Sequence, residues 1–310
     1  MTRTVATVLL CGAFAVSIAS SQPPELGAPL DPALFAVHRT IPDGPPGAVG
    51  LVVDPLALAH SRGPDEHFAD VRILDSSNRQ VPYVVEHRDD PLVVPLAPER
   101  AEPPVSSPGV AVKRANVSSY RLKLPTANLP PSRIAIETSA HIFQRVVQLG
   151  VVRPADRRAR NARLETLAAT TWGHVESEEA AAALTLSVVP GGASELWLSI
   201  DEGDNSALPI TAVRLLLPSY RLRFYRPARS ALLLVYGRSD LLSPRYDLAL
   251  ASGELMNTTV SEVTPLGERH ADRARQPLVS PARFWLFLAI AVAILLALIV
   301  RLVTRPAEKH

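Results

Sequence analysis

The most distinctive polar segment of this sequence is an acidic turn, Asp201-Glu202-Gly203-Asp204-Asn205. Carboxylate and amide oxygens are the ligands that Ca²⁺ prefers, so Asp201, Asp204 and Asn205 form a candidate calcium site. The spacing does not follow the EF-hand pattern. The alternative is a simple turn, because Gly, Asp and Asn are common turn formers and its acids would be solvated.

A second polar segment brings aromatic and guanidinium side chains near one turn. The strand-like runs Leu232–Tyr236 and Tyr246–Leu250 flank this turn. Tyrosine rings and arginine side chains can recognise a sugar or a protein surface. The alternative is that these side chains fill one end of a β-sandwich. The four candidate binding residues are Tyr236, Arg238, Arg245 and Tyr246.

Motifs of the common catalytic mechanisms are absent from the sequence. It contains no G-x-S-x-G elbow, no phosphate-binding G-x-x-x-x-G-K loop and no H-E-x-x-H pair. The nearest cluster of metal-ligand types, His60 with Asp65, Glu66 and His67, follows no zinc spacing. We therefore predict a noncatalytic protein whose one candidate cofactor is Ca²⁺. The alternative is an envelope carbohydrate-active hydrolase that uses two acids such as Asp201 and Asp204.

Charge and cysteine content narrow the classes further. The 32 basic and 30 acidic residues leave a net charge of +2 without a basic stripe, which argues against nucleic-acid binding. The single cysteine, Cys11, lies in a segment with the features of a signal peptide. The mature protein would then have no thiol, which excludes disulfides, cysteine-ligated metals and cysteine nucleophiles.

The elements between the two ends are expected to be β-strands. Several runs alternate apolar and polar residues, as in Tyr120–Leu124 and Tyr220–Phe224, and this period of two is typical of a strand with one buried face. The expected strands are Leu34–Ile41, Ala48–Val53, Asp70–Leu74, Val81–His87, Val117–Leu124, Arg133–Thr138, Ile142–Val152, Ala162–Ala168, Ala183–Val189, Leu196–Ile200, Ile210–Leu217, Tyr220–Tyr225, Leu232–Tyr236 and Tyr246–Leu250.

Many short strands separated by Pro and Gly favour an all-β fold built from sandwiches. The Pro-rich stretch 98–109 reads as a linker. It would separate an N-terminal β-module at 25–97 from a larger β-sandwich at 110–255, for which a jelly-roll or galactose-binding-like arrangement is one candidate. Residues 256–282 read as a stalk, and a helical turn is expected within Leu56–His60.

The two ends predict the topology. Arg3, an apolar run and the small residues Ala19, Ser20 and Ser21 form a signal peptide over residues 1–21. Near the C-terminus, the residues from Phe284 to Val300 are apolar throughout and would cover about 25 Å as a helix. We expect a transmembrane helix at 284–303, in the inner (cytoplasmic) membrane, with the bulk of the chain periplasmic and a cytoplasmic tail at 304–310.

Three segments together resemble a family of uncharacterised bacterial membrane-anchored proteins with a domain of unknown function. They span residues 68–84, 198–210 and 236–249, and the first contains Asp70-Val-Arg-Ile followed by Val81-Pro-Tyr. The resemblance implies a signal peptide, a β-rich periplasmic region and a C-terminal membrane helix. It implies no catalytic residue. We expect the β-sandwich to bind a protein partner, with a multi-pass membrane protein as one candidate, or a glycan.

Overall fold

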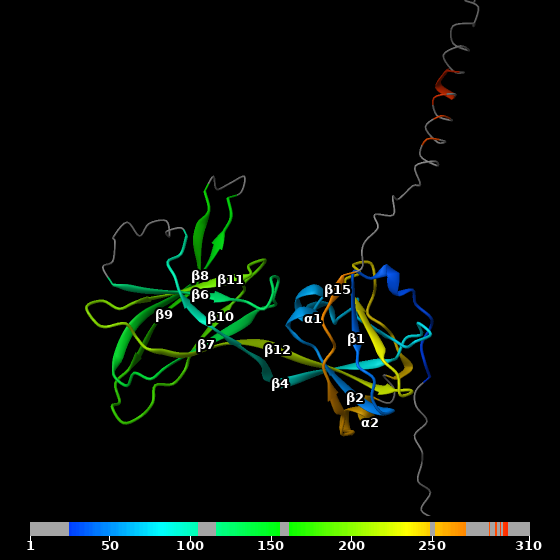
Figure 1. Ribbon diagram of the computed structural model, residues 1–310, viewed down its shortest axis with the longest axis horizontal. Coiled ribbons are helices and arrows are strands. Elements are labelled where there is room, and N and C mark those ends of the chain that lie inside the picture. The colour runs from blue at the N-terminus through cyan, green and yellow to red at the C-terminus, as the bar shows by residue number, and fades with distance from the viewer. Residues whose placement is uncertain are drawn as a thin grey trace, which may run out of the picture.

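The computed structural model describes residues 25–104, 116–155, 161–248 and 252–270, with six further positions between 285 and 296. Within these residues the chain is mostly β-strand (Figure 1), which confirms the all-β prediction. The helices are α1 (Pro55–His60), α2 (Ser252–Asn257) and the 3-10 turns η1 (Pro32–Leu34) and η2 (Pro64–Glu66). The strands are β1 (Val37–Ile41), β2 (Gly47–Val52), β3 (Arg72–Leu74), β4 (Tyr83–Leu96), β5 (Pro98–Arg100), β6 (Val117–Lys123), β7 (Ser132–Thr138), β8 (Phe143–Arg153), β9 (Arg163–His174), β10 (Leu184–Val188), β11 (Glu195–Asp201), β12 (Ile210–Arg226), β13 (Leu232–Tyr236), β14 (Ser261–Val263) and β15 (Arg269–His270).

The strands form three sheets. One has the order β15-β1-β13-β3, and a second has the order β5-β6-β11-β8-β9. In the third, β4 lies along one edge of the long strand β12. The other edge of β12 pairs first with β7, which continues to β10, and then with β2, which continues to β14. This third sheet therefore extends through the whole of the described molecule.

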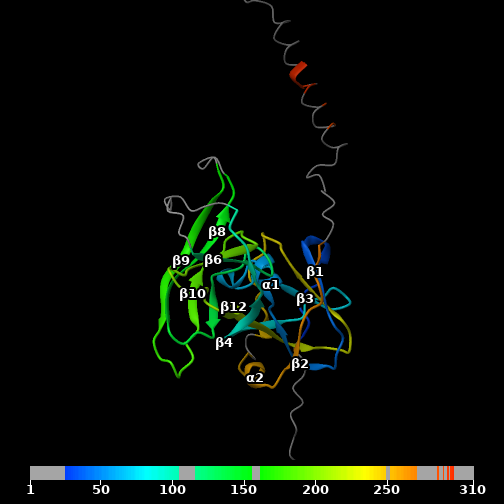
Figure 2. The same ribbon diagram turned by 60° about the vertical axis from the view of Figure 1, so that its left-hand side comes forward.

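The molecule has two lobes, and the strands β4 and β12 of the third sheet run from one lobe to the other (Figures 1 and 2). We call residues 25–88 and 219–270 lobe 1, and residues 89–218 lobe 2. In lobe 1 the first sheet packs on one half of the shared sheet, where Leu51, Leu222 and Leu234 are almost fully buried. In lobe 2 the second sheet supplies the buried side chains of β6, β8 and β11 to the same core as those of β7 and β12. Each lobe is thus a two-layered β-structure.

Alternation of apolar residues located most strands correctly. The burial pattern of β1 alternates strictly between buried and half-buried positions, as a period of two requires. Two expected strands, Ile210–Leu217 and Tyr220–Tyr225, form the single strand β12. The expected strand Tyr246–Leu250 is not observed in its described part, because Asp247 and Leu248 lie in a helical turn.

Strand pairing crosses the expected domain boundaries. Strand β13, assigned from sequence to the sandwich at 110–255, pairs with β1 and β3 in lobe 1. The part of the expected stalk that is described also belongs to lobe 1, because β14 pairs with β2 and β15 pairs with β1. Residues 98–100 of the expected linker form β5, which pairs with β6. Lobe 1 is therefore built from two distant parts of the chain, and lobe 2 is inserted between them.

The predicted ends lie outside the part of the chain that can be compared. The signal peptide at 1–21, with Cys11, falls outside the described residues, and so does most of the helix predicted at 284–303. Among the residues that the structure describes, no helix is long and apolar enough to cross a membrane. Both topology predictions therefore stay predictions.

Candidate functional site

The pairing of the two strands that join the lobes shifts its register at one level. Leu217 of β12 pairs with Leu92 of β4, whereas Ser219 pairs with Arg88. Pro218 therefore lies opposite the three residues 89–91 of β4, the last of which is Pro91. Proline cannot donate a hydrogen bond to a ladder, and a bulge bends the strand that carries it. The shared sheet consequently changes direction at this point, which we call the hinge.

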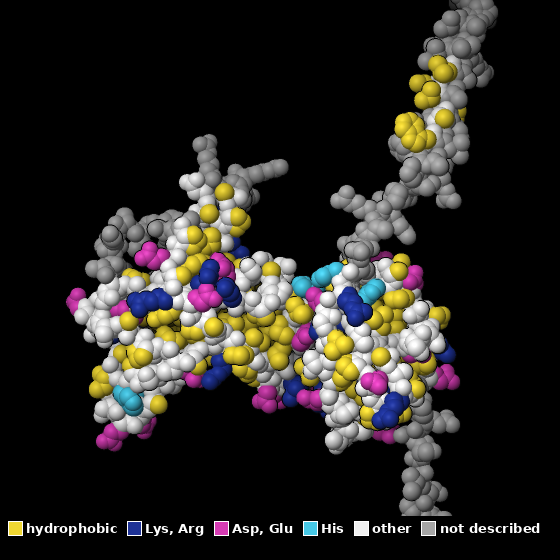
Figure 3. All heavy atoms as spheres, viewed as in Figure 1, with side chains coloured by type: hydrophobic (Ala, Val, Ile, Leu, Met, Phe, Trp, Pro, Cys, Tyr) yellow, Lys and Arg dark blue, Asp and Glu magenta, His cyan; other side chains and the backbone are white. Residues whose placement is uncertain are grey.

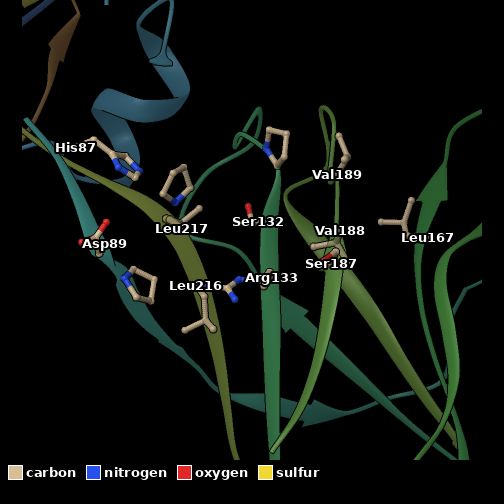
Figure 4. A pocket seen from close by; sticks show the side chains of 13 residues that line it. His87, Asp89, Ser132, Arg133, Leu167, Ser187, Val188, Val189, Leu216 and Leu217 are labelled. Carbon is tan, nitrogen blue, oxygen red and sulfur yellow. The ribbon is translucent and has the colours of Figure 1, made fainter. Parts of the chain in front are cut away.

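An open cleft of about 540 Å³ adjoins the hinge on lobe 2 (Figure 4). We call it the waist cleft. Its lining comes from five strands and their ends: β4, β7, β9, β10 and β12. The lining residues are His87, Asp89, Pro91, Pro131, Ser132, Arg133, Leu167, Ser187, Val188, Val189, Leu216, Leu217 and Pro218.

The floor of the waist cleft is an outward face of the shared sheet. Ser187 of β10 pairs with Arg133 of β7, Arg133 pairs with Leu216 of β12, and Leu216 pairs with Val93 of β4. Directly opposed residues in a sheet point to the same side, so these four side chains form one row. Ser187, Arg133 and Leu216 line the cleft, and the row continues beyond the lining to Val93, which is 48% exposed. The floor therefore combines a guanidinium with a partly exposed apolar side chain.

Polar groups stand at the side of the waist cleft nearest lobe 1. His87 and Asp89 are both exposed. The His87 ring lies 5.1 Å from the Tyr220 ring, which in turn makes an edge contact with Phe68 at 5.1 Å between centroids. Burial raises the pKa of Tyr220, and the nearby Asp65 raises it further. The cleft thus offers one carboxylate, one imidazole and one guanidinium around an apolar floor, and Figure 3 shows apolar side chains gathered over the waist of the molecule.

The binding face expected from Tyr236, Arg238, Arg245 and Tyr246 is not formed. Tyr236 is fully buried, and its hydroxyl donates a hydrogen bond to Glu268 at 2.5 Å. Its ring packs in the core of lobe 1 near Leu51, Phe68 and Leu222, so it cannot present an aromatic face to a ligand. This part of the prediction was wrong.

The other three residues of that expected face have separate surroundings. Arg238 forms two hydrogen bonds with Asp240, at 2.6 and 2.9 Å. Tyr246 is half-buried, donates a hydrogen bond to Gln80 at 3.1 Å, and has a pKa raised to about 12 by burial. Arg245 is exposed. Of these contacts, the hydrogen bond from Tyr246 to Gln80 joins residues 237–248 to the rest of lobe 1.

The acidic turn of the calcium prediction is held together by internal hydrogen bonds. The Asp201 carboxylate accepts from the Gly203 amide at 3.2 Å, and the Asn205 amide donates to the Glu202 carbonyl at 3.1 Å. Asp204 is exposed. Glu202, which was not singled out from sequence, is buried and paired with Arg145 at 2.8 Å. Over the described ranges there is no group of three or more His, Asp or Glu side chains placed to hold a metal ion.

The cluster of His60, Asp65, Glu66 and His67, which follows no zinc spacing in the sequence, is divided between separate contacts. Glu66 pairs with Arg62, and His67 and Phe68 both adopt left-handed backbone conformations, with φ of 52° and 51°. His60 lies apart from them and contacts Glu268 at 2.9 Å.

Sequence reasoning did not single out any residue of the waist cleft. The available signal was the presence of Pro91 and Pro218 within strand-like runs. Proline inside a strand pattern marks an edge or a bulge. Locating the cleft, however, requires knowing that these two prolines face each other across a β4–β12 ladder formed by residues more than a hundred positions apart.

Comparison with known proteins adds little. No family model and no curated protein matches the chain. Among solved structures, it matches the stem and receptor binding domain of the spike protein P1 from bacteriophage PM2, with 10% sequence identity over 67% of this chain and 98% of that chain. The TM-score is 0.19, so this likeness carries no argument. The resemblance to uncharacterised bacterial membrane-anchored proteins stays a prediction.

Proposed function

We propose that this chain is a noncatalytic, membrane-tethered protein of the bacterial envelope that binds a segment of a partner protein in the waist cleft. The observation that carries the proposal is the row of side chains on the cleft floor, in which the exposed Arg133 lies beside the half-buried Leu216. Apolar surface next to an arginine is typical of sites that recognise protein segments. The predicted signal peptide and membrane helix supply the tether.

The lining of the waist cleft favours a protein ligand over a glycan. Protein sites for sugars commonly present an aromatic ring to the apolar face of the sugar. None of the thirteen residues that line the cleft is Trp, Tyr or Phe. Three are prolines and five are leucine or valine, which suit contact with apolar side chains of an extended peptide.

The same lining argues against the alternative of a carbohydrate-active hydrolase. Glycoside hydrolysis by the usual mechanism requires two carboxyl groups on either side of the bond that is cut. The lining contains one carboxylate, that of Asp89. The acids expected to serve this role, Asp201 and Asp204, belong to the turn after β11 and do not line the cleft.

A crosslinking pull-down from the native membrane tests the proposal. Val189 lines the cleft and is 60% exposed, so Val189→Asp places a charge on the binding surface without disturbing the core. Leu242→Asp is the matched control, because Leu242 is 84% exposed and lies in lobe 1 away from the cleft. We expect wild type and Leu242→Asp to recover the same partner and Val189→Asp to recover about ten-fold less.

A variant lacking residues 284–310 separates the two halves of the proposal. If the partner is recovered from detergent extract without these residues, lobe 2 carries the recognition. If recovery is lost with residues 284–310 but insensitive to Val189→Asp, the partner is bound within the membrane and the cleft is not its site. Equal recovery by all variants, or no partner with any of them, would refute the proposal.

A further inference from the structure

A chain of polar side chains joins the two lobes at a point separate from the strands β4 and β12. Thr126, in the loop between β6 and β7 of lobe 2, is half-buried. Its hydroxyl lies 3.2 Å from Nε2 of His60, the last residue of α1 in lobe 1. The other ring nitrogen of His60, Nδ1, lies 2.9 Å from the Glu268 carboxylate. We call this arrangement the cross-lobe relay.

The chemistry of the partners fixes the direction of the hydrogen bonds in the cross-lobe relay. An ionised carboxylate only accepts hydrogen bonds, and Glu268 also accepts from Tyr236. The proton of a neutral His60 therefore resides on Nδ1, and Nε2 is left as an acceptor. The Thr126 hydroxyl consequently donates to His60. Each member of the relay thus fixes the tautomer or orientation of the next.

Glu268 lies on a segment that is firmly held on lobe 1. We call residues 264–270 the strap. Arg39 donates to the carbonyls of Pro265 and Leu266, at 3.2 and 2.7 Å, and is itself held by two 2.7 Å hydrogen bonds to Asp54. The Arg39 side chain is 3% exposed, so its hydrogen bonds to the strap are shielded from water. The strap leads from lobe 1 toward the membrane helix predicted at 284–303.

From these contacts we infer that His60 couples the position of the strap to the angle between the lobes. The hinge lies where residues 89–91 face Pro218, and the waist cleft adjoins it. A change in the angle between the lobes alters the spacing between His87, on the lobe 1 side of the hinge, and Arg133 in lobe 2. Thr126 and His60 oppose such a change because their hydrogen bond spans the lobes. Displacement of the strap would move Glu268, release His60 and free the hinge.

This inference rests on the proposed function, because it holds that a movement of the strap, acting through the cross-lobe relay, changes the shape of the waist cleft. It predicts a conformational coupling that is measurable without any partner. The two ideas can therefore fail separately: failure of the coupling leaves the effect of Val189→Asp on partner recovery as expected, whereas failure of the pull-down leaves the hinge measurement intact.

Hydrogen–deuterium exchange of the full-length protein in detergent micelles tests the coupling. Thr126→Val keeps the size of the side chain and removes the hydroxyl, whereas Thr126→Ser keeps the hydroxyl and is the matched control. Loss of one typical hydrogen bond shifts a local opening equilibrium by roughly five-fold. We expect about five-fold faster exchange for peptides covering the hinge, residues 86–96 and 213–222, in Thr126→Val and wild-type exchange in Thr126→Ser.

An internal reference distinguishes coupling from general destabilisation. Peptides from β8 lie within lobe 2 and away from the hinge, so their exchange should be unchanged in Thr126→Val. The inference is overturned if the hinge peptides of Thr126→Val exchange as in wild type. It is equally overturned if hinge and β8 peptides accelerate together, because the hydroxyl would then support the whole fold. Glu268→Ala should accelerate the same hinge peptides, since it removes the side-chain oxygens that accept from Nδ1 of His60 without altering Thr126.

Discussion

The carboxylate of Glu86 offers the sharpest test of the interactions that hold lobe 1 together. It lies on β4 directly opposite Arg221 of β12, with Arg223 diagonal to it. Each guanidinium binds it through two nitrogens, Arg221 at 2.5 and 3.0 Å and Arg223 at 2.7 and 3.0 Å. The three side chains are between 8% and 14% exposed. Arg223 also donates to the carbonyls of Leu255 and Thr258, so this cluster connects the shared sheet to α2.

The two arginines lower the pKa of Glu86 from its ordinary value near 4.5 to about 2. The hydrogen bonds from Arg221 and Arg223 are the main causes, and partial burial opposes them. At 1.36 kcal/mol for each pH unit, this difference corresponds to roughly 3 kcal/mol. Water at the rim of the cluster screens part of this stabilisation, since Glu262, which binds Arg221 at 2.8 Å, is 49% exposed. We therefore expect about 2 kcal/mol of stabilisation from ionised Glu86.

The direction in which stability changes with pH follows from the linkage between proton binding and folding. A carboxyl whose pKa is lower in the folded state contributes its full stabilisation above its unfolded pKa and loses it as the pH falls toward the folded one. The contribution of Glu86 is thus complete above about pH 5, and the lowered pKa of about 2 implies that more than half of it is lost by about pH 3. Glu86→Gln should lower the free energy of unfolding by about 2–3 kcal/mol at pH 7, because two largely buried guanidinium groups lose their counter-charge. The difference from wild type should shrink steadily toward pH 3.

Urea denaturation of wild type and Glu86→Gln between pH 3 and 7 measures this difference. Glu99→Gln is the matched control, because Glu99 also binds two cations, Arg121 at 2.6 Å and Lys123 at 2.9 Å. The Glu99 side chain is 42% exposed, and exposed ion pairs contribute little to stability, so its substitution should change little at any pH. The reasoning is refuted if Glu86→Gln is as stable as wild type at pH 7, or if its deficit is the same at pH 3 and pH 7.

Two further substitutions test other parts of the fold. Glu202→Gln should lower the free energy of unfolding by about 3 kcal/mol, because the Glu202 side chain is fully buried and is the charge partner of Arg145. Thermal denaturation measures this loss. A loss below about 1 kcal/mol would show that water reaches the pair. Gly50→Ala should lower the free energy of unfolding by about 1–3 kcal/mol, because a Cβ there would lie 2.6 Å from the Arg221 side chain and 2.9 Å from Val260. Gly253→Ala is the control, because a Cβ at Gly253 meets nothing within 4 Å.

Local pattern in the sequence was enough to find the strands, because a strand with one buried face must alternate apolar and polar residues wherever it lies. The polar-apolar runs that begin at Tyr120 and at Tyr220 both lie in observed strands, β6 and β12. The same local information gave the helical turn at α1, where Asp54 caps the first turn through its side chain. An all-β architecture followed from these elements without any knowledge of their partners.

Which strands pair was decided only by tertiary structure, because strand pairing depends on residues far apart in the chain. Nothing local to Leu232–Tyr236 indicates that it inserts between β1 and β3, and so the boundary expected between two consecutive modules was misplaced. Tyr236 was read as a surface residue for the same reason. Its ring is buried in a core that includes Leu51 of β2 and Leu222 of β12, and its hydroxyl donates a hydrogen bond to Glu268, which lies 32 positions further along the chain.

The waist cleft also depends partly on local sequence and partly on tertiary structure. Pro91 and Pro218 are visible in the sequence, and each by itself predicts only a local interruption of a strand. They create a hinge because β4 and β12 lie side by side and their pairing register shifts at the level of both prolines. The sequence by itself determined the elements and the positions at which a proline interrupts the hydrogen bonding of a strand. The tertiary structure decided which of these sites meet, since only long-range packing brings distant segments into one ladder.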